Sequence, residues 1–254
     1  MRTSRMAALI AAAILAATAA MSGTPANATH SWGGYHWART SNPFTLKMGD
    51  NVSSTWDSYF NTANSQWTQS TVLDLAATTG GTTGKLCKAT VGRVEVCNAA
   101  YGRNGWLGLA SISITGGTHI TQGTVKVNDT YFAMAQYNNP AERAHVMCQE
   151  IGHTLGLGHT SEDGSSQQTC MDYSQDPNST APNAHDYAQL ASTYSHLDST
   201  TTVGFNTGAS SAQVGNDRAT WGREVDRSAN GDHSTFVRKQ PDGTLIVTDV
   251  IWAN

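Results

Sequence analysis

The sequence predicts an α+β domain, because strand-like and helix-like apolar patterns occupy separate stretches of the chain. Between Asn42 and Met48, apolar residues alternate with other residues, which is the period of a half-buried strand. Trp56, Phe60, Ala63 and Trp67 instead recur at helical spacing, which is typical of an amphipathic helix. Seven tryptophans and many aliphatic residues suffice for a core, although charged residues are sparse.

The N-terminal stretch is expected to be a targeting segment that takes no part in the fold. Basic residues precede the apolar run Met6–Ala20, and Ala26-Asn27-Ala28 has the pattern of a cleavage site. An uncleaved membrane anchor is the alternative, but the apolar run is short for a membrane span. We therefore expect a signal peptide over residues 1–28, a secreted mature chain beginning near Thr29, and no membrane association of that chain.

Further elements follow in chain order. Ser53 or Ser54 is expected to cap the first helix, which ends near Thr68. The expected strands are Asn42–Met48, Val72–Thr78, Trp106–Ile114 and Ile120–Val127. A second helix starts at Pro140, which suits the first helical position, and runs through His145 into the segment Gln149–Gly156.

This second helix carries residues with the spacing of metal ligands. Gln149 and His153 are four residues apart and share one face of a helix. Gly156 can end the helix with positive φ, so that His159 returns towards the same point. Three such side chains predict a catalytic metal site that leaves one position open for water.

Together with Met171 and Tyr173, this segment resembles the metzincin clan of zinc endopeptidases. The clan signature is H-E-x-x-H-x-x-G-x-x-H followed by a Met-turn. Glu150, His153, Gly156, His159, Met171 and Tyr173 match it. The first histidine of the signature is replaced by Gln149, as in the QExxH variant that occurs among gametolysin-like metallopeptidases.

The resemblance implies a role for each matching residue. Glu150 would be the general base, and His153 and His159 would bind zinc. Met171 would form a hydrophobic floor below the ligands. Tyr173 would hydrogen-bond the oxyanion or bind the metal.

The resemblance also implies a fold and a kind of substrate. The fold would be a twisted mixed sheet with an active-site helix, a Met-turn and a C-terminal helix, for which Pro182–Leu197 is the candidate. An edge strand over the cleft would pair with an extended peptide.

The glutamine alters the expected metal chemistry. The amide oxygen of Gln149 is a weaker ligand than imidazole, so we expect lower zinc affinity or a changed preference among metals such as Cu²⁺. The alternative is that Gln149 is only a helix residue and the metal site is inactive.

His145 lies about 12 Å along the helix axis from His153, too far to share one ion, and is expected to be a surface or core histidine. His119 is expected to be a solvated polar residue rather than a second metal ligand.

The four cysteines predict disulfides in a secreted chain. Of the three possible pairings we favour Cys87–Cys97, which closes a hairpin or loop, and Cys148–Cys170, which ties the active-site helix to the Met-turn. No C-x-x-C occurs, which argues against a zinc site of four thiolates.

The loop Ser161–Gln168 is a weak candidate for Ca²⁺, and a solvated turn is the favoured interpretation.

We expect three parts along the chain: the signal peptide (1–28), a metzincin-like metallopeptidase domain (29–197), and a Thr/Ser/Gly-rich linker with a C-terminal β-hairpin appendage (198–254). The turn signal of the hairpin is Pro241-Asp242-Gly243. The sequence suggests no function for this last part.

Two functions compete at this stage. The first is a secreted zinc-dependent endopeptidase, and the second is a catalytically weak or inactive protein that binds peptides on the same scaffold. Glu150 favours the enzyme, because a binding protein needs no proton shuttle. A serine hydrolase is disfavoured because no G-x-S-x-G occurs. The net charge of −4 and the lack of a basic cluster argue against nucleic acid as a partner. We therefore expect a monomer that acts on peptide or protein.

Overall fold

The computed structural model of the chain describes residues 30–204 and 213–253. The predicted signal peptide (1–28) and residues 205–212 of the expected linker lie outside the described residues. No helix within the described ranges is both long enough and apolar enough to cross a membrane.

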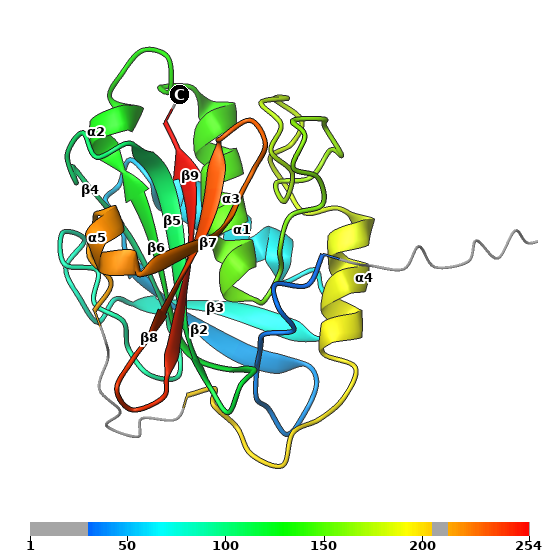
Figure 1. Cartoon of the computed structure of the whole chain (residues 1–254). Coiled ribbons are helices and arrows are strands. Elements are labelled where there is room, and N and C mark those ends of the chain that lie inside the picture. Colours follow the sequence, from blue (N-terminus) through cyan, green and yellow to red (C-terminus); the bar gives the residue numbers. More distant parts are fainter. Residues whose placement is uncertain (1–29, 205–212, 254) are drawn as a thin grey trace, which may run out of the picture.

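One mixed sheet of nine strands forms the centre of the molecule, with the order β3-β2-β4-β6-β5-β9-β8-β7 and with β1 pairing β6 off this path (Figure 1). The strands are β1 (His36–Trp37), β2 (Phe44–Asn51), β3 (Leu73–Thr79), β4 (Val94–Ala99), β5 (Trp106–Thr115), β6 (His119–Asn128), β7 (Arg223–Arg227), β8 (His233–Lys239) and β9 (Leu245–Trp252). The strands from β3 to β6 pair in parallel, and those from β6 to β7 pair antiparallel. The expected α+β class with a mixed sheet is confirmed.

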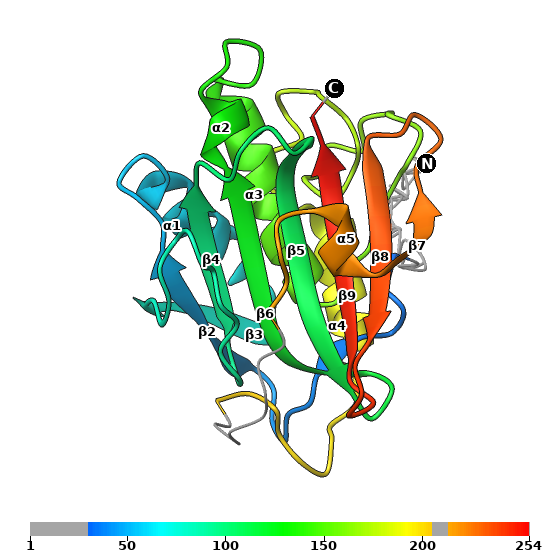
Figure 2. The same cartoon turned by 60° about the vertical axis from the view of Figure 1, so that its left-hand side comes forward.

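The helices cover both faces of this sheet. They are α1 (Asp57–Trp67), α2 (Asp129–Phe132), α3 (Pro140–Thr154), α4 (Ala184–Thr193) and α5 (Arg218–Trp221). Figure 2 shows α1, α3 and α4 behind the sheet and the short α5 in front of β5 and β9. Two apolar clusters result, a large one on the side of α3 and a smaller one under Trp221 of α5.

Local sequence patterns account for the helices that were expected. In α1 the predicted apolar stripe is buried, although Trp56 rather than a serine is the N-cap residue and makes no side-chain cap. In α3 the side chain of Asn139 accepts a hydrogen bond from the Glu142 amide, and Pro140 opens the helix. The final helix of the expected domain is present as α4, whose N-terminus has a capping box between Asn183 and Asp186.

Strand β5 is present where the sequence predicted Trp106–Ile114, and both of its faces are covered. Leu107 and Ile112 belong to the cluster on the α3 side, whereas Trp106 and Leu109 belong to the cluster under α5. Both of its edges are also paired, one with β6 and the other with β9. It therefore offers no free edge to a peptide, and β3 and β7 end the path of the described sheet.

The C-terminal hairpin is present as β8 and β9, but it does not stand apart as an appendage. Strand β9 pairs with β5 along the length of both strands, from Ile114↔Leu245 to Trp106↔Trp252. Ile246 and Val250 complete the smaller cluster, while Val247 and Ile251 join the larger one. The tail is therefore part of the sheet, because its alternating apolar residues cover both faces at β5.

Both expected disulfides are formed. Cys87 pairs with Cys97, which lies on β4 rather than in a loop, and Cys148 of α3 pairs with Cys170. The second bond joins the helix to the segment that contains Met171, as the sequence suggested.

Candidate metal centre

The helix α3 presents the central residues of the site and ends where the sequence indicates. Gln149, Glu150 and His153 lie in its last two turns and are fully buried. Gly156 follows the helix with a φ of 92°. A Cβ at this position would lie 2.0 Å from the carbonyl oxygen of Tyr35, so both the turn and the close approach require glycine.

Three ligand atoms converge beyond this turn, and one of them was not expected. The Nε2 atom of His153 lies 3.5 Å from Oδ1 of Asp249, and Nε2 of His159 lies 3.7 Å from the same oxygen. Ligand atoms of the three residues all lie within 4.8 Å of one another. Asp249 belongs to β9, so the C-terminal hairpin contributes directly to the centre.

The three atoms fit a metal ion because they are buried and make no hydrogen bonds among the described residues. The other polar atom of each side chain is already used. His153 Nδ1 lies 2.8 Å from the Leu157 carbonyl, His159 Nδ1 lies 2.6 Å from the Tyr173 hydroxyl, and Asp249 Oδ2 accepts a hydrogen bond from Thr235. Contacts of this kind orient ligating imidazoles, and two nitrogens with one carboxylate suit a zinc-class ion.

Burial and charge reinforce this arrangement. Burial holds the pKa of His159 well below its usual range, which keeps the ring neutral, as a metal ligand must be. Burial alone would raise the pKa of Asp249, but the neighbouring His153 and His159 bring it below its ordinary value. Asp249 is therefore held as a carboxylate whose free oxygen faces two imidazoles.

Gln149 makes one hydrogen bond and leaves its other amide atom free. Its Nε2 donates to the carbonyl oxygen of Asp172 at 2.9 Å, whereas Oε1 is buried without a hydrogen-bond partner among the described residues. This donor fixes the amide orientation and leaves the oxygen as the atom available to a metal. A role of Gln149 as a ligand stays a prediction.

Glu150 lies against β5 at a glycine. A Cβ on Gly108 would lie 2.7 Å from Oε1 of Glu150 and 2.6 Å from Cγ1 of Val146. Both carboxylate oxygens of Glu150 are buried and lack hydrogen-bond partners among the described residues. Burial, followed by the charge of Asp249, raises the pKa of Glu150 well above its ordinary value.

Tyr173 contacts the ligand His159, and its ring covers a further histidine. Its hydroxyl reaches His159 Nδ1, and its ring stacks on that of His233 with 3.5 Å between the ring centroids. His233 lies on β8, and its Nδ1 is 3.5 Å from Oδ1 of Asp249. In this conformation Tyr173 orients His159, while its expected roles at the oxyanion or the metal stay predictions.

Met171 packs against α3 at Gly152, and its expected role as a floor below the ligands stays a prediction. A Cβ on Gly152 would lie 2.5 Å from the sulfur of Met171 and 2.7 Å from the ring of Trp67. The glycine between Glu150 and His153 therefore lets the methionine and the tryptophan pack directly against the helix. This contact determines the distance between the helix and the segment that contains Met171.

Sequence reasoning missed Asp249 and His233, although one signal was available. Asp249 is the one charged residue in the mostly apolar stretch Leu245–Ile251. A carboxylate in a buried strand needs a partner, which is a reason to look for cations or a metal beside it. Its proximity to α3 follows from the β5–β9 pairing, which no local pattern reveals.

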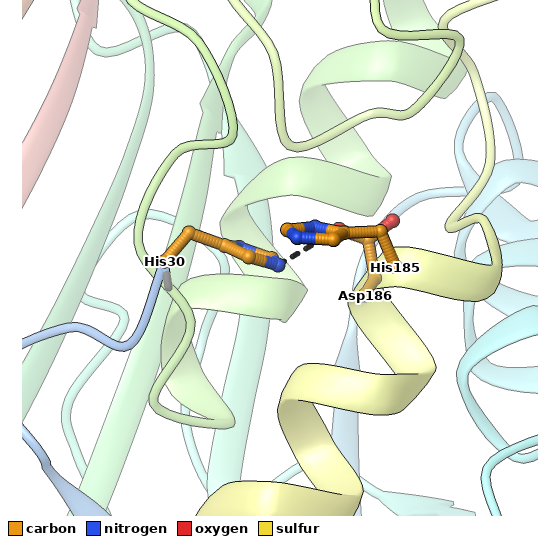
Figure 3. A group of neighbouring side chains, drawn as sticks. All are labelled: His30, His185 and Asp186. Atoms are coloured by element: carbon orange, nitrogen blue, oxygen red, sulfur yellow. Dashed lines mark ion pairs between the residues drawn. The ribbon is translucent and has the colours of Figure 1, made fainter. Parts of the chain in front are cut away.

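A second group of ligand-type side chains, shown in Figure 3, supports the loop that carries His159. His30 Nε2 lies 3.5 Å from Asp186 Oδ1 on α4, and the ring of His30 stacks on that of His185 with 4.7 Å between centroids. The backbone carbonyl of His30 accepts a hydrogen bond of 2.6 Å from the Gly158 amide. His30 therefore links α4 to the residue that precedes His159.

The remaining candidates from the sequence do not belong to the group of three ligands, although Glu162 Oε1 lies 3.9 Å from His159 Nδ1. His145 is buried, and its Nδ1 is 2.6 Å from the Ser179 carbonyl, in agreement with a core histidine. Asp163 is exposed and accepts a hydrogen bond from the Ser165 amide within its own turn. Within the described ranges neither Asp163 nor Glu162 belongs to a group of three converging His, Cys, Asp or Glu ligands, so Ca²⁺ at this loop stays an unsupported prediction.

The centre is closed to solvent in this conformation. Glu150 and His153 are 0% exposed, and Asp249 is 1% exposed. Strand β9, which carries Asp249, covers the side of β5 that would otherwise be open. The carboxyl group of Glu150 is therefore not accessible to solvent in this arrangement.

Comparison with solved structures places two proteins among those to which this chain is similar. One is high choriolytic enzyme 1, a hatching enzyme zinc-protease from Oryzias latipes (medaka fish), with 12% identity, a TM-score of 0.36, and coverage of 63% of this chain and 94% of that chain. The other is myroilysin, with 14% identity, a TM-score of 0.35, and coverage of 62% and 82% respectively. No model of a known protein family matches the chain, and no curated protein matches it.

Proposed function

We propose that this protein is a secreted, zinc-dependent endopeptidase that is held in a closed state by its own C-terminal hairpin. The observation that carries the proposal is the convergence of two imidazole nitrogens and one carboxylate oxygen, all buried and without hydrogen-bond partners among the described residues. Glu150 lies close enough for the charge of Asp249 to raise the pKa of its carboxyl group. Unpaired polar atoms are costly in a protein interior, so a bound cation is the simplest compensation.

His153, His159 and Asp249 would hold the ion in the closed state. A bound zinc ion lowers the pKa of a coordinated water and polarises the carbonyl group of a peptide. Glu150 would take a proton from the attacking water and deliver it to the leaving amine. Tyr173 would keep the His159 ring in place through Nδ1.

The hairpin would regulate access to the site. Asp249 occupies a position that faces both histidines, and β9 fills the edge of β5, where an extended peptide would pair. When the hairpin moves, Asp249 leaves and both positions become available. The free amide oxygen of Gln149 would then serve as the third ligand.

A non-catalytic metal-binding protein is the competing function, and the burial of Glu150 is the observation in its favour. If the hairpin never moves, Asp249 is a permanent ligand and the ion has a structural role only. The two functions differ in whether any cleavage depends on Glu150.

The first experiment measures bound zinc and peptide cleavage on the same preparations. We expect the mature chain to bind zinc at this centre and to cleave casein or gelatin in a way that a chelator stops. Glu150→Ala should abolish cleavage and retain the zinc, because its carboxylate is not among the three converging ligand atoms. Cleavage that persists in Glu150→Ala or in chelator would refute the assignment.

The second experiment locks the hairpin to β5. Ser111 and Thr248 are direct neighbours across the β5–β9 pair, with their hydroxyl oxygens 2.9 Å apart. Alternation along both strands places them on the face away from α3. We expect the oxidised Ser111→Cys/Thr248→Cys chain to bind zinc without cleaving substrate, and mild reduction to restore cleavage.

The single variant Ser111→Cys is the matched control, and its activity should be unaffected by mild reduction. Equal cleavage by the locked and the unlocked chain would show that the hairpin does not gate the site. Zinc binding with no cleavage by either form would favour the non-catalytic function.

A further inference from the structure

Another set of ligand atoms converges in residues that do not belong to the centre containing Glu150. His36 lies on β1, and His196 and Asp198 follow α4. The two Nε2 atoms of the histidines are 3.3 Å apart, and each lies 3.6 Å from Oδ1 of Asp198. We call these three residues the β1 triad.

The dimensions of the β1 triad match one face of a tetrahedral metal site. Zinc binds histidine nitrogens at about 2.0–2.1 Å and carboxylate oxygens at similar distances, so neighbouring ligand atoms in a tetrahedron are about 3.3 Å apart. The three measured separations of 3.3, 3.6 and 3.6 Å need only small side-chain adjustments to meet this value. The two imidazole rings are nearly perpendicular (86°), so they do not stack on each other, and both Nε2 atoms can point towards one ion.

Neighbouring groups orient two of the three ligands. His36 Nδ1 lies 3.0 Å from the Gly34 carbonyl, to which it can donate, and this leaves the lone pair of Nε2 free. Asp198 Oδ2 accepts hydrogen bonds from the backbone amide of Arg39 at 3.1 Å and from its guanidinium at 2.8 Å. These contacts direct the other carboxylate oxygen towards the histidines, as outer contacts do in metal sites.

The site is also accessible and has a further donor nearby. The side chain of His196 is 51% exposed, so an ion can enter from solvent. His119, at the start of β6, places its Nε2 3.2 Å from Oδ1 of Asp198. His119 therefore contacts Asp198 beside the triad, rather than being simply a solvated polar residue.

We propose that His36, His196 and Asp198 bind a divalent transition-metal ion of the zinc class, separate from the Glu150 centre. Two imidazoles and one carboxylate favour zinc or its neighbours over calcium or magnesium, which prefer oxygen ligands. The ion would tie β1 to the segment that leaves α4. The ion would have a structural role, because the carboxylate of Asp198 is itself a ligand, is held by Arg39, and is not free to act as a base.

The test is the number of zinc ions bound by the full chain. We expect two bound ions for the wild type, and one for His196→Asn, which alters a half-exposed residue and should leave the fold intact. The affinity of the second ion should fall at least about tenfold, because even outer contacts of metal-ligating histidines change affinity by about 10–100-fold. His153→Asn/His159→Asn should lose the other ion and keep this one.

Cobalt provides a readout that does not depend on activity. Loading the His153→Asn/His159→Asn chain with Co²⁺ should give a visible d–d absorption spectrum that the further change His196→Asn removes. His185→Asn is the matched control, because it alters a partly buried histidine of the group in Figure 3, and the spectrum should persist. Equal zinc binding by wild type and His196→Asn would overturn the proposal, whether or not the peptidase assignment holds.

Discussion

At the scale of single residues, Asp249 adds a buried carboxylate oxygen to the ring nitrogens of His153 and His159, while Gln149 stays a predicted ligand. Asp249 and Gln149 differ in charge, and a carboxylate compensates a divalent ion better than a neutral amide does. They also come from different parts of the chain, one from α3 and the other from β9. The effects of substituting each residue on metal binding can therefore be measured separately.

Substitution of Asp249 is predicted to weaken metal binding in the closed chain while making the centre easier to open. We expect Asp249→Asn to lower zinc affinity at this centre and to raise cleavage of casein. The measurements are zinc titration and initial cleavage rate on the same preparation. An unchanged affinity would remove Asp249 from the ligand set, and an unchanged rate would remove its role in closure.

The matched change at the other candidate is Gln149→His. An imidazole replaces the amide oxygen, so zinc should bind more tightly if position 149 faces the ion. The new ring cannot reproduce the donor contact of Gln149 Nε2 with the Asp172 carbonyl in every rotamer. Weaker or equal zinc binding would therefore mean that Gln149 serves only to hold the Asp172 segment.

At the scale of secondary-structure elements, the contact between α3 and β5 determines where Glu150 lies. The helix approaches the strand at Gly108, where no side chain separates them. Similarly, Gly152 lets Met171 approach from below. Close contacts at two glycines, Gly108 of β5 and Gly152 of α3 itself, therefore hold the helix from two sides.

Gly108→Ala is predicted to destabilise the protein by about 1–3 kcal/mol, the usual cost of overpacking a core. The added methyl group would meet Val146 and Glu150 at the distances given above, and the helix would have to shift. Urea unfolding measures the effect as a lower midpoint. Thr115→Ala, at the exposed end of the same strand, is the control and should change stability by less than about 0.5 kcal/mol. Equal midpoints for the two variants would contradict the close contact.

The sequence predicts these elements unequally, and the reason is the range of the interactions. The stripe in α1, the cap of α3 and the turn at Gly156 depend on neighbouring residues, so their patterns are visible in the chain. Strand β4 was not predicted, because the segment closed by Cys87 and Cys97 was interpreted only as a hairpin or loop. The place of Asp249 was missed because it depends on the pairing of β9 with β5.

At the scale of the whole molecule, the sheet has a second buried region under α5, which contains a lysine. Lys126 of β6 donates from Nζ to the Val214 carbonyl at 2.8 Å and to Asn216 Oδ1 at 2.9 Å. Burial lowers the pKa of Lys126 to about 8. Lys126 therefore couples the described segment after residue 212 to the sheet in a pH-dependent way.

This pKa predicts how stability changes in alkali. Between pH 8 and 10 the unfolded chain binds more protons at this lysine than the folded chain, so the free energy of unfolding should rise with pH. The full difference is on the order of 3 kcal/mol, because each pKa unit corresponds to about 1.36 kcal/mol. Urea unfolding of the wild type and Lys126→Met from pH 7.5 to 9.5 checks this. The rise should be missing in the variant, and parallel curves would contradict the assignment.

The late position of β9 in the chain has a consequence during biosynthesis. Until residues 245–252 have been made, β5 pairs on one side only, and its other backbone edge can recruit strands from any neighbouring polypeptide. Pairings between distant segments also form slowly. A newly made chain thus passes through a stage at which it is prone to aggregate and exposes His153 and His159 without Asp249, so chaperones would matter most before the final strand arrives.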